Sequence, residues 1–173
     1  MGAVFTLARF SEAFLLLRAS TLGLGNDYVP MVLVVMNLVY AASSYPAGHL
    51  SDRIDRRVVF ASGAITLMVA DLVLARAAGF VWLAVGISLW GLHMGLSQGL
   101  LAAMVAYAAP SERRGTSFGL FNLMSGIVLL FASLLAGGLW DHFGPAFVFY
   151  AGACFAAVAL FGIVMQLRYP KPN

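Results

Sequence analysis

Arg9 and Glu12 are ionisable residues inside the first apolar segment, which extends over about residues 2–24. Residues three positions apart share one face of a helix, so this spacing predicts an ion pair. Ionisable groups in a long apolar segment are costly and usually face a cavity or a partner. The functional interpretation makes Glu12 a proton-coupling or cation-binding carboxylate that Arg9 controls. The alternatives are a structural ion pair or an Arg9 side chain that reaches the membrane surface.

Five further polar side chains interrupt apolar segments and are candidates for a substrate or proton cavity. They are His93, Gln98, Asn37, Tyr40 and Asn122. A histidine at such a position could bind substrate or relay protons, and a hydrogen-bonded packing role is the alternative. A lone amide between apolar helices commonly holds those helices together. A purely structural role is therefore open for Asn37 and Asn122 as well.

No set of residues in the sequence predicts catalysis or a cofactor. There is no H-E-x-x-H pattern, no phosphate-binding glycine loop and no Ser-His-Asp set with plausible proximity. The single cysteine, Cys154, lies in an apolar run and offers neither a disulfide nor a metal cluster. The net charge of +3 is spread over short clusters without a basic face, which argues against nucleic-acid binding. We expect no enzymatic activity, no cofactor, no metal and no nucleic-acid partner.

The elements that must position these residues are long apolar helices. Hydrophobic residues make up 62% of the 173 residues, and the mean hydropathy is +0.92. The apolar runs repeatedly reach about 20 residues, the length that spans a bilayer. The start MGAVFTLARF runs directly into a helix, so a cleaved signal peptide is not predicted. We predict an all-α polytopic membrane protein, one domain over 1–173, with spans at about 2–24, 29–49, 58–76, 80–108, 116–139 and 146–167.

Basic residues gather in alternate connections between these spans. Lys and Arg are retained on the cytoplasmic side during insertion, so both termini are predicted to be cytoplasmic. On the other side, we interpret Asp71 and Arg76 as a pair at the membrane interface. The cytoplasmic connections and tail hold seven of the ten Lys and Arg residues: Arg53, Arg56, Arg57, Arg113, Arg114, Arg168 and Lys171.

Small residues recur every four positions on two of the predicted helices. Gly91, Gly95 and Gly99 form such a stripe on the fourth, and Ser133 and Gly137 repeat the spacing on the fifth. Stripes of this kind allow another helix to approach closely. They predict helix packing and carry no chemistry of their own.

The segment GHLSDRIDRRVVF, residues 48–60, is partly repeated in GGLWDHFGPAFVF, residues 137–149. Gly48, Leu50 and Asp52 align with Gly137, Leu139 and Asp141, and Phe60 aligns with Phe149. The two copies fall on opposite membrane faces, which predicts two inverted three-helix repeats, about 1–79 and 80–173. A chance match in glycine-rich membrane sequence is the alternative.

The stretch GHLSDRIDRR resembles the loop signature of the major facilitator superfamily. The matching positions are Gly48, Leu50, Asp52, Arg53, Arg56 and Arg57, and the pattern departs at Asp55, where glycine is expected. RFSEAFLLLRA, GLHMGLSQG and PSERRGTSFGLFN resemble the seventh helix, the tenth helix and the following loop of bacterial members. The resemblance covers essentially the whole chain and implies the C-terminal six-helix half of the twelve-helix fold.

The resemblance implies a secondary transporter of a bacterial inner membrane that moves a small molecule by alternating access, with proton coupling. It makes Asp52 the acid of a cytoplasmic latch surrounded by Arg53, Arg56 and Arg57, with Glu112 and Arg114 as partners. It also implies lipid and a second six-helix half, from the same parent chain, a partner or a second copy. Two alternatives remain open: the arginines only set topology, or the protein is a non-transporting remnant or assembly subunit.

Overall fold

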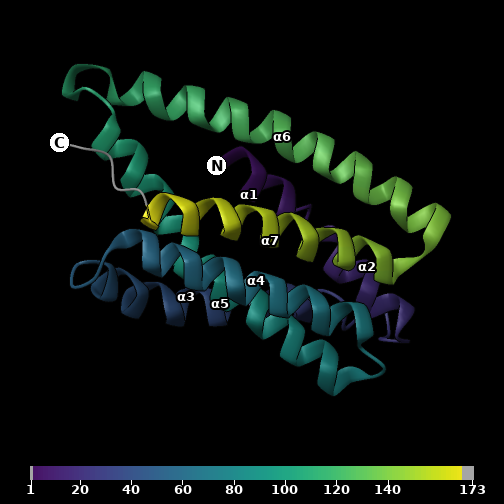
Figure 1. The fold of residues 1–173 in the computed structure, drawn as a ribbon. Coiled ribbons are helices and arrows are strands. Elements are labelled where there is room, and N and C mark those ends of the chain that lie inside the picture. Colours follow the sequence, from purple (N-terminus) through teal and green to yellow (C-terminus); the bar gives the residue numbers. More distant parts are fainter. Residues whose placement is uncertain (1, 169–173) are drawn as a thin grey trace.

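The described part of the chain, residues 2–168 of a computed structural model, consists of helices joined by short connections (Figure 1). Lipid offers no partners for backbone polar groups, and helices satisfy those groups within one segment. The all-α prediction is confirmed, and the predicted tail residue Lys171 lies outside the described residues. The elements are α1 (Gly2–Ala8), α2 (Ala13–Thr21), α3 (Met31–Ser51), α4 (Arg56–Arg76), α5 (Phe80–Ala108), the 3₁₀ turn η1 (Ser111–Arg113), α6 (Arg114–Phe143) and α7 (Pro145–Arg168).

Five of these helices, α3 to α7, are long and apolar enough to cross a membrane. The prediction of one continuous helix over residues 2–24 is wrong, because the chain breaks between α1 and α2. At the break, the Ser11 hydroxyl accepts a hydrogen bond from the Ala13 backbone N–H at 3.3 Å. A serine that bonds to a nearby backbone group in this way competes with the helical ladder. The hydroxyl within the break therefore gives one backbone N–H group at the start of α2 a partner.

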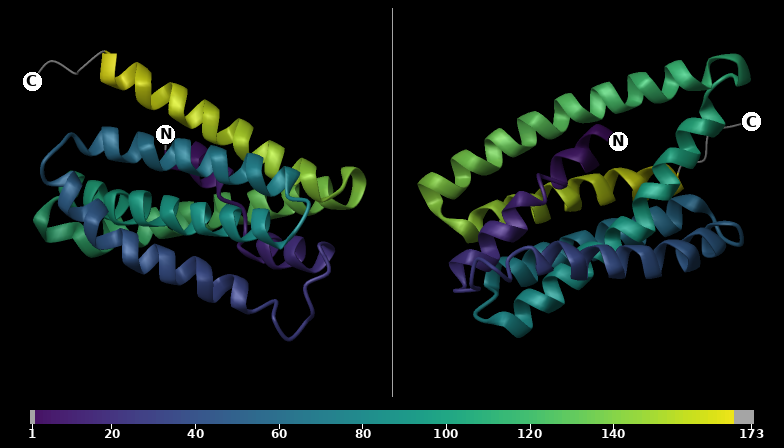
Figure 2. Two further views of the ribbon diagram at one scale, coloured as in Figure 1. Left: turned by 90° about the horizontal axis from the view of Figure 1, so that it is seen from below. Right: turned by 180° about the vertical axis from the view of Figure 1, so that it is seen from behind.

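The helices form a bundle with α6 along one side (Figure 1, Figure 2). α5 packs against both α3 and α4, and α7 packs on the other side of α4. Apolar side chains fill the space between α4, α5 and α7, including Leu67, Leu74, Trp90 and Phe149, all at most 2% exposed. Phe10 joins this core from the α1–α2 connection. This contact holds the junction of α1 and α2 against the rest of the bundle.

The α3–α4 connection, the α5–α6 connection and the C-terminal end of α7 lie at the same end of the bundle (Figure 1, Figure 2). These are the connections in which the sequence concentrates arginine. At the opposite end, Arg18 of α2 ties the last turn of α4 in place. Its guanidinium donates hydrogen bonds to the carbonyls of Leu74 at 3.0 Å, Ala75 at 3.3 Å and Ala77 at 2.9 Å. Carbonyls at a helix C-terminus have no partner within the helix, so this contact satisfies them.

The outer face of α6 is apolar and uncovered. Within the 18-residue apolar stretch of α6, only 6% of the residues are buried against the rest of the chain. Leu120 and Leu123 are each 60% exposed, Phe131 is 62% exposed and Leu134 is 63% exposed. An exposed apolar surface of this extent requires lipid or another protein to cover it.

Candidate functional site

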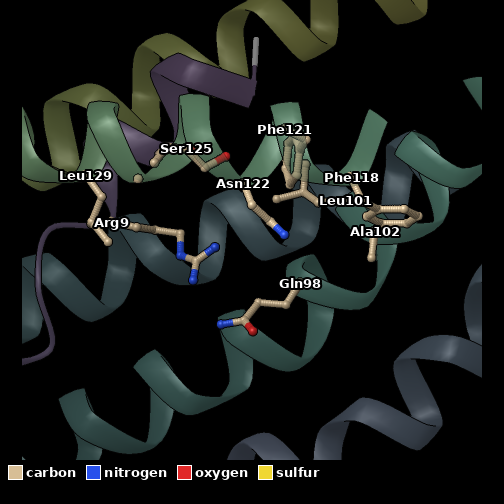
Figure 3. A pocket seen from close by; sticks show the side chains of 11 residues that line it. Arg9, Gln98, Leu101, Ala102, Phe118, Phe121, Asn122, Ser125 and Leu129 are labelled. Carbon is tan, nitrogen blue, oxygen red and sulfur yellow. The ribbon is translucent and has the colours of Figure 1, made fainter. Parts of the chain in front are cut away.

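A cavity of about 460 Å³ opens between α1, α5 and α6, a volume within the usual range for small-molecule sites (Figure 3). Arg9, at the end of α1, points into it. Gln98 of α5 and Asn122 of α6 approach the same space from two other directions. The structure thus brings together three of the candidate cavity residues from three distant parts of the sequence.

The rest of the cavity wall was not singled out from the sequence. Thr6 and Ser125 add hydroxyl groups, and Phe118 and Leu129 are part of an otherwise apolar wall. Phe118, Asn122, Ser125 and Leu129 follow one another at spacings of four, three and four, which places them on one face of a helix. This spacing was the available signal, but a serine in an apolar helix does not by itself indicate which face lines a cavity.

Arg9 is half-buried, and Glu12 and Tyr40 lie within electrostatic range of its guanidinium. Within the described residues, the Arg9 side chain forms neither an ion pair nor a hydrogen bond. The predicted helical ion pair of Arg9 with Glu12 is absent because the helix that would align them is interrupted between α1 and α2. Glu12 instead lines a smaller cavity of about 230 Å³, which shares Arg9 and Leu129 with the larger one.

Three candidate cavity residues lie elsewhere. His93 is 0% exposed and packs in the core with its ring centroid 5.3 Å from that of Trp90. Asn37 is exposed and donates a hydrogen bond to the Leu33 carbonyl one turn earlier, at 2.8 Å. Tyr40 lines a separate cavity beside the α3–α4 connection. None of these three side chains lines the cavity that contains Arg9, although His93 and Tyr40 lie within electrostatic range of its guanidinium.

Asp71 is a buried charged residue whose position the sequence did not reveal. It is 0% exposed, and neither carboxylate oxygen has a hydrogen-bond partner among the described residues. Its Oδ2 stands 2.6 Å from where a Cβ on Gly152 would be, so α7 passes directly over it. The predicted interfacial pair with Arg76 is wrong, because Arg76 is exposed. Five residues along an α-helix turn the chain by about 500° around the helix axis, which is about 140° more than one full turn. The two side chains therefore lie on different faces of α4.

The arginine-rich connection is shaped by Asp55, the position where the family signature has glycine. Asp55 is the N-cap of α4, with φ −56° and ψ 124°, and its Oδ1 accepts a hydrogen bond from the Arg57 N–H at 2.8 Å. Aspartate is among the preferred N-cap residues, and this backbone conformation needs no glycine. Asp52 and Arg56 line a cavity of about 310 Å³ between this connection and α5. Glu112 and Arg114 are exposed, and the described residues hold no ion pair between them and Asp52.

The small-residue stripe on α5 faces α3 over part of its length. A Cβ at Gly91 would collide with the Met36 carbonyl oxygen, and one at Gly95 would collide with the Ser43 hydroxyl. A Cβ at Gly99 would meet nothing within 4 Å, and the same holds at Gly137 of α6. Ser133 and Gly137 are each half-buried. The close contact between α5 and α3 is therefore confined to the first two glycines of the stripe.

Comparison with known proteins gives a family match over nearly the whole chain. A family profile described as Major Facilitator Superfamily matches residues 2–173. An uncharacterized MFS-type transporter of Methanocaldococcus jannaschii is 33% identical over 165 residues, which is 92% of this chain and 41% of that protein. A lysosomal dipeptide transporter of Danio rerio is 30% identical over 130 residues, covering 73% of this chain and 28% of that protein. A putative glycerol-3-phosphate transporter of Arabidopsis thaliana is 30% identical over 144 residues, covering 76% and 27%. The chain spans less than half the length of each of these relatives.

Proposed function

Because the chain belongs to the major facilitator superfamily, whose members are transporters and not enzymes, we propose that it forms half of a secondary transporter that moves a small molecule by alternating access. In this proposal its segments form two inverted three-helix repeats, about 1–79 and 80–173. The protein lies in a bacterial inner membrane with both termini in the cytoplasm, and the sequence resemblance favours the C-terminal half.

The observation that carries the proposal is the cavity lined by Arg9, Gln98 and Asn122. Polar groups from three helices converge in an otherwise apolar bundle, and such groups mark substrate pathways in membrane proteins. α6 contributes Asn122 and Ser125 to the wall of this cavity, and its opposite face is the uncovered apolar one. A second six-helix half that faces the opening of the cavity would complete its wall. That half comes from the same parent chain, a partner protein or a second copy.

The α3–α4 connection is the proposed cytoplasmic latch. Asp52 is exposed at the end of α3 and lines the cavity that also contains Arg56. A carboxylate is favoured at the positive end of a helix, and arginine can hold a carboxylate through two parallel hydrogen bonds. In the closed state Asp52 would cap a helix of the opposite half, with Arg53, Arg56 and Arg57 tying neighbouring helix ends together. Glu112 and Arg114 are the partners we propose from the α5–α6 connection.

Protons are the proposed coupling ion, and Glu12 is the proposed carboxylate that carries them. Glu12 lies at the start of α2 and lines the small cavity next to Arg9. A neighbouring charge changes how readily a carboxylate binds a proton. The two cavities share Arg9, so a charge that enters the larger cavity acts close to Glu12.

A transport assay tests the proposal. The protein is purified from its native membrane in the assembly it forms there and placed in liposomes that contain a pH-sensitive dye. Glycerol 3-phosphate, a dipeptide and glucose are offered as probes under a pH gradient. We expect proton-coupled flux of at least one probe, and loss of that flux in Asp52→Ala while membrane insertion persists. Absence of flux with every probe would favour the non-transporting assembly subunit.

Glu12→Gln separates the coupling role from the transport role. We expect substrate flux in this variant to lose its dependence on pH, while Asp27→Asn, in the exposed α2–α3 connection, leaves that dependence intact. An unchanged pH profile in Glu12→Gln would remove Glu12 from the coupling mechanism. Full flux in Asp52→Ala would likewise remove the latch role, without affecting the assignment of the cavity.

A further inference from the structure

We propose that the cavity between α1, α5 and α6 binds the oxyanion group of a small anionic substrate, a carboxylate or a phosphate, with Arg9 as its counter-charge. The inference rests on the proposed transport function and adds a substrate class to it. It starts from the charges of the lining. Of the 11 residues that line the cavity, Arg9 is charged and none is Asp or Glu.

The Arg9 guanidinium is available for a ligand. Within the described residues it meets no carboxylate within ion-pair distance and donates no side-chain hydrogen bond. Its surroundings in the cavity are largely apolar, with Phe118, Phe121 and Leu129 among the lining residues. A cation in a low-dielectric wall is costly to leave uncompensated. A carboxylate or phosphate would supply the missing charge and could bond to two guanidinium N–H groups at once.

The other polar groups suit the same ligand. The Gln98 and Asn122 carboxamides approach the space in front of Arg9 from α5 and α6 (Figure 3). Each carries two N–H donors that can bond to the remaining oxygens of an oxyanion. Their carbonyl oxygens can accept from hydroxyl groups elsewhere on the substrate. The arrangement therefore fits a small molecule with one anionic end and a polar body.

Glu12 reduces the positive potential of Arg9, because it lies within electrostatic range of the guanidinium, but it forms no ion pair with it among the described residues. Glu12 lines the neighbouring small cavity and is absent from the lining of the larger one. The N-terminus of α2 lies at the same small cavity. The partial charge of the helix dipole at this end is positive, like the charge of Arg9. The larger cavity consequently presents donors and one positive charge to its contents.

Binding to the purified assembly in nanodiscs tests the inference, with the thermal midpoint as the measurement. The probes are glycerol 3-phosphate for the phosphate class, lactate for the carboxylate class and glycerol as the neutral control. We expect one of the two anions to stabilise the protein and glycerol to have no effect. In Arg9→Gln the affinity for that anion should fall by about 10–100-fold, the range for losing a charge-assisted contact. Arg76→Gln, which removes an exposed arginine outside this cavity, is the matched control.

A second variant keeps the test decisive if Arg9→Gln does not fold. Asn122 is exposed in the chain, so Asn122→Asp preserves volume and packing while adding a negative charge to the cavity. We expect it to abolish anion binding, whereas Asn26→Asp in the exposed α2–α3 connection does not. Anion binding that survives Asn122→Asp, stabilisation by glycerol alone, or no response to either anion would overturn the inference. Transport of a neutral probe such as glucose would leave the transporter proposal standing, so the two failures are distinguishable.

Discussion

The contact between α5 and α3 predicts different outcomes for one substitution at two glycines of the same helix. A Cβ at Gly91 would stand against the Met36 carbonyl oxygen and 3.1 Å from the Val39 Cβ, whereas a Cβ at Gly99 would meet nothing within 4 Å. The Met36 oxygen belongs to the backbone of α3, so it can move only if the helix moves. Gly91→Ala should therefore push the two helices apart, and Gly99→Ala should not.

The magnitude follows from two opposing terms. Replacing glycine by alanine inside a helix contributes about 1 kcal/mol of stability through propensity, and this term is the same at both positions. Overpacking a tight contact costs about 1–3 kcal/mol. Gly99→Ala should then stabilise the protein by about 1 kcal/mol, and Gly91→Ala should be less stable than Gly99→Ala by about 1–3 kcal/mol. For a chain of this size the difference corresponds to roughly 2–12 °C in thermal midpoint.

Thermal unfolding of the two variants in the same detergent, followed by intrinsic fluorescence, measures this difference directly. Because the propensity term cancels between the variants, the gap isolates the helix contact. Equal midpoints for Gly91→Ala and Gly99→Ala would refute the reasoning, since they would mean that α3 does not approach α5 at Gly91. A lower midpoint for Gly99→Ala would show instead that another surface packs on that end of the stripe.

Two further predictions concern single residues in the structure, and a third concerns the membrane topology. Arg18→Ala removes three hydrogen bonds to the end of α4 and should lower the free energy of unfolding by about 1.5–3 kcal/mol in a denaturant titration. The control Arg76→Ala should change the free energy of unfolding by less than about 0.5 kcal/mol. Equal losses of stability in the two variants would contradict the contact between Arg18 and α4. Asp71→Asn replaces a buried carboxyl group that has no hydrogen-bond partner among the described residues, without changing volume, and should raise the thermal midpoint. A fall of several degrees would show that the carboxyl group stabilises the packing under α7 and would refute this reasoning. In a cysteine-free background, Ile54→Cys and Glu112→Cys should both react with an impermeant maleimide from the cytoplasmic side only, and labelling from opposite sides would refute the topology.

The predicted pair of Asp71 and Arg76 is wrong because the sequence does not define which face of a helix packs against a neighbour. Both residues stand near the end of an apolar run, and one sequence cannot tell which face of the helix meets a neighbour. The direction of a side chain around a helix has meaning only relative to what packs there. In the structure, Gly152 of α7 and the α1–α2 connection cover Asp71, while Arg76 faces outward. Both partners are distant in sequence, so no local pattern indicated them.

Only part of the cavity lining could be predicted from the sequence, for a related reason. Arg9, Gln98 and Asn122 were recognised as costly polar groups in apolar segments, and they do line one cavity. His93 satisfied the same criterion, yet it packs beside Trp90 in the core. Polarity in an apolar helix predicts that a side chain needs a special environment, but it does not distinguish a cavity from a packed interior.

The sequence alone determined the helical class, the membrane-spanning segments from α3 to α7 and the family signature around Asp52, because run length, composition and loop residues are local properties. Tertiary structure decided which polar groups share a space, that α1 and α2 are separate helices and that the α5 stripe is tight at Gly91 but open at Gly99. The shared cavity and the uneven stripe depend on how distant helices are rotated and spaced against one another. Packing sets that geometry through many weak contacts distributed over the whole chain.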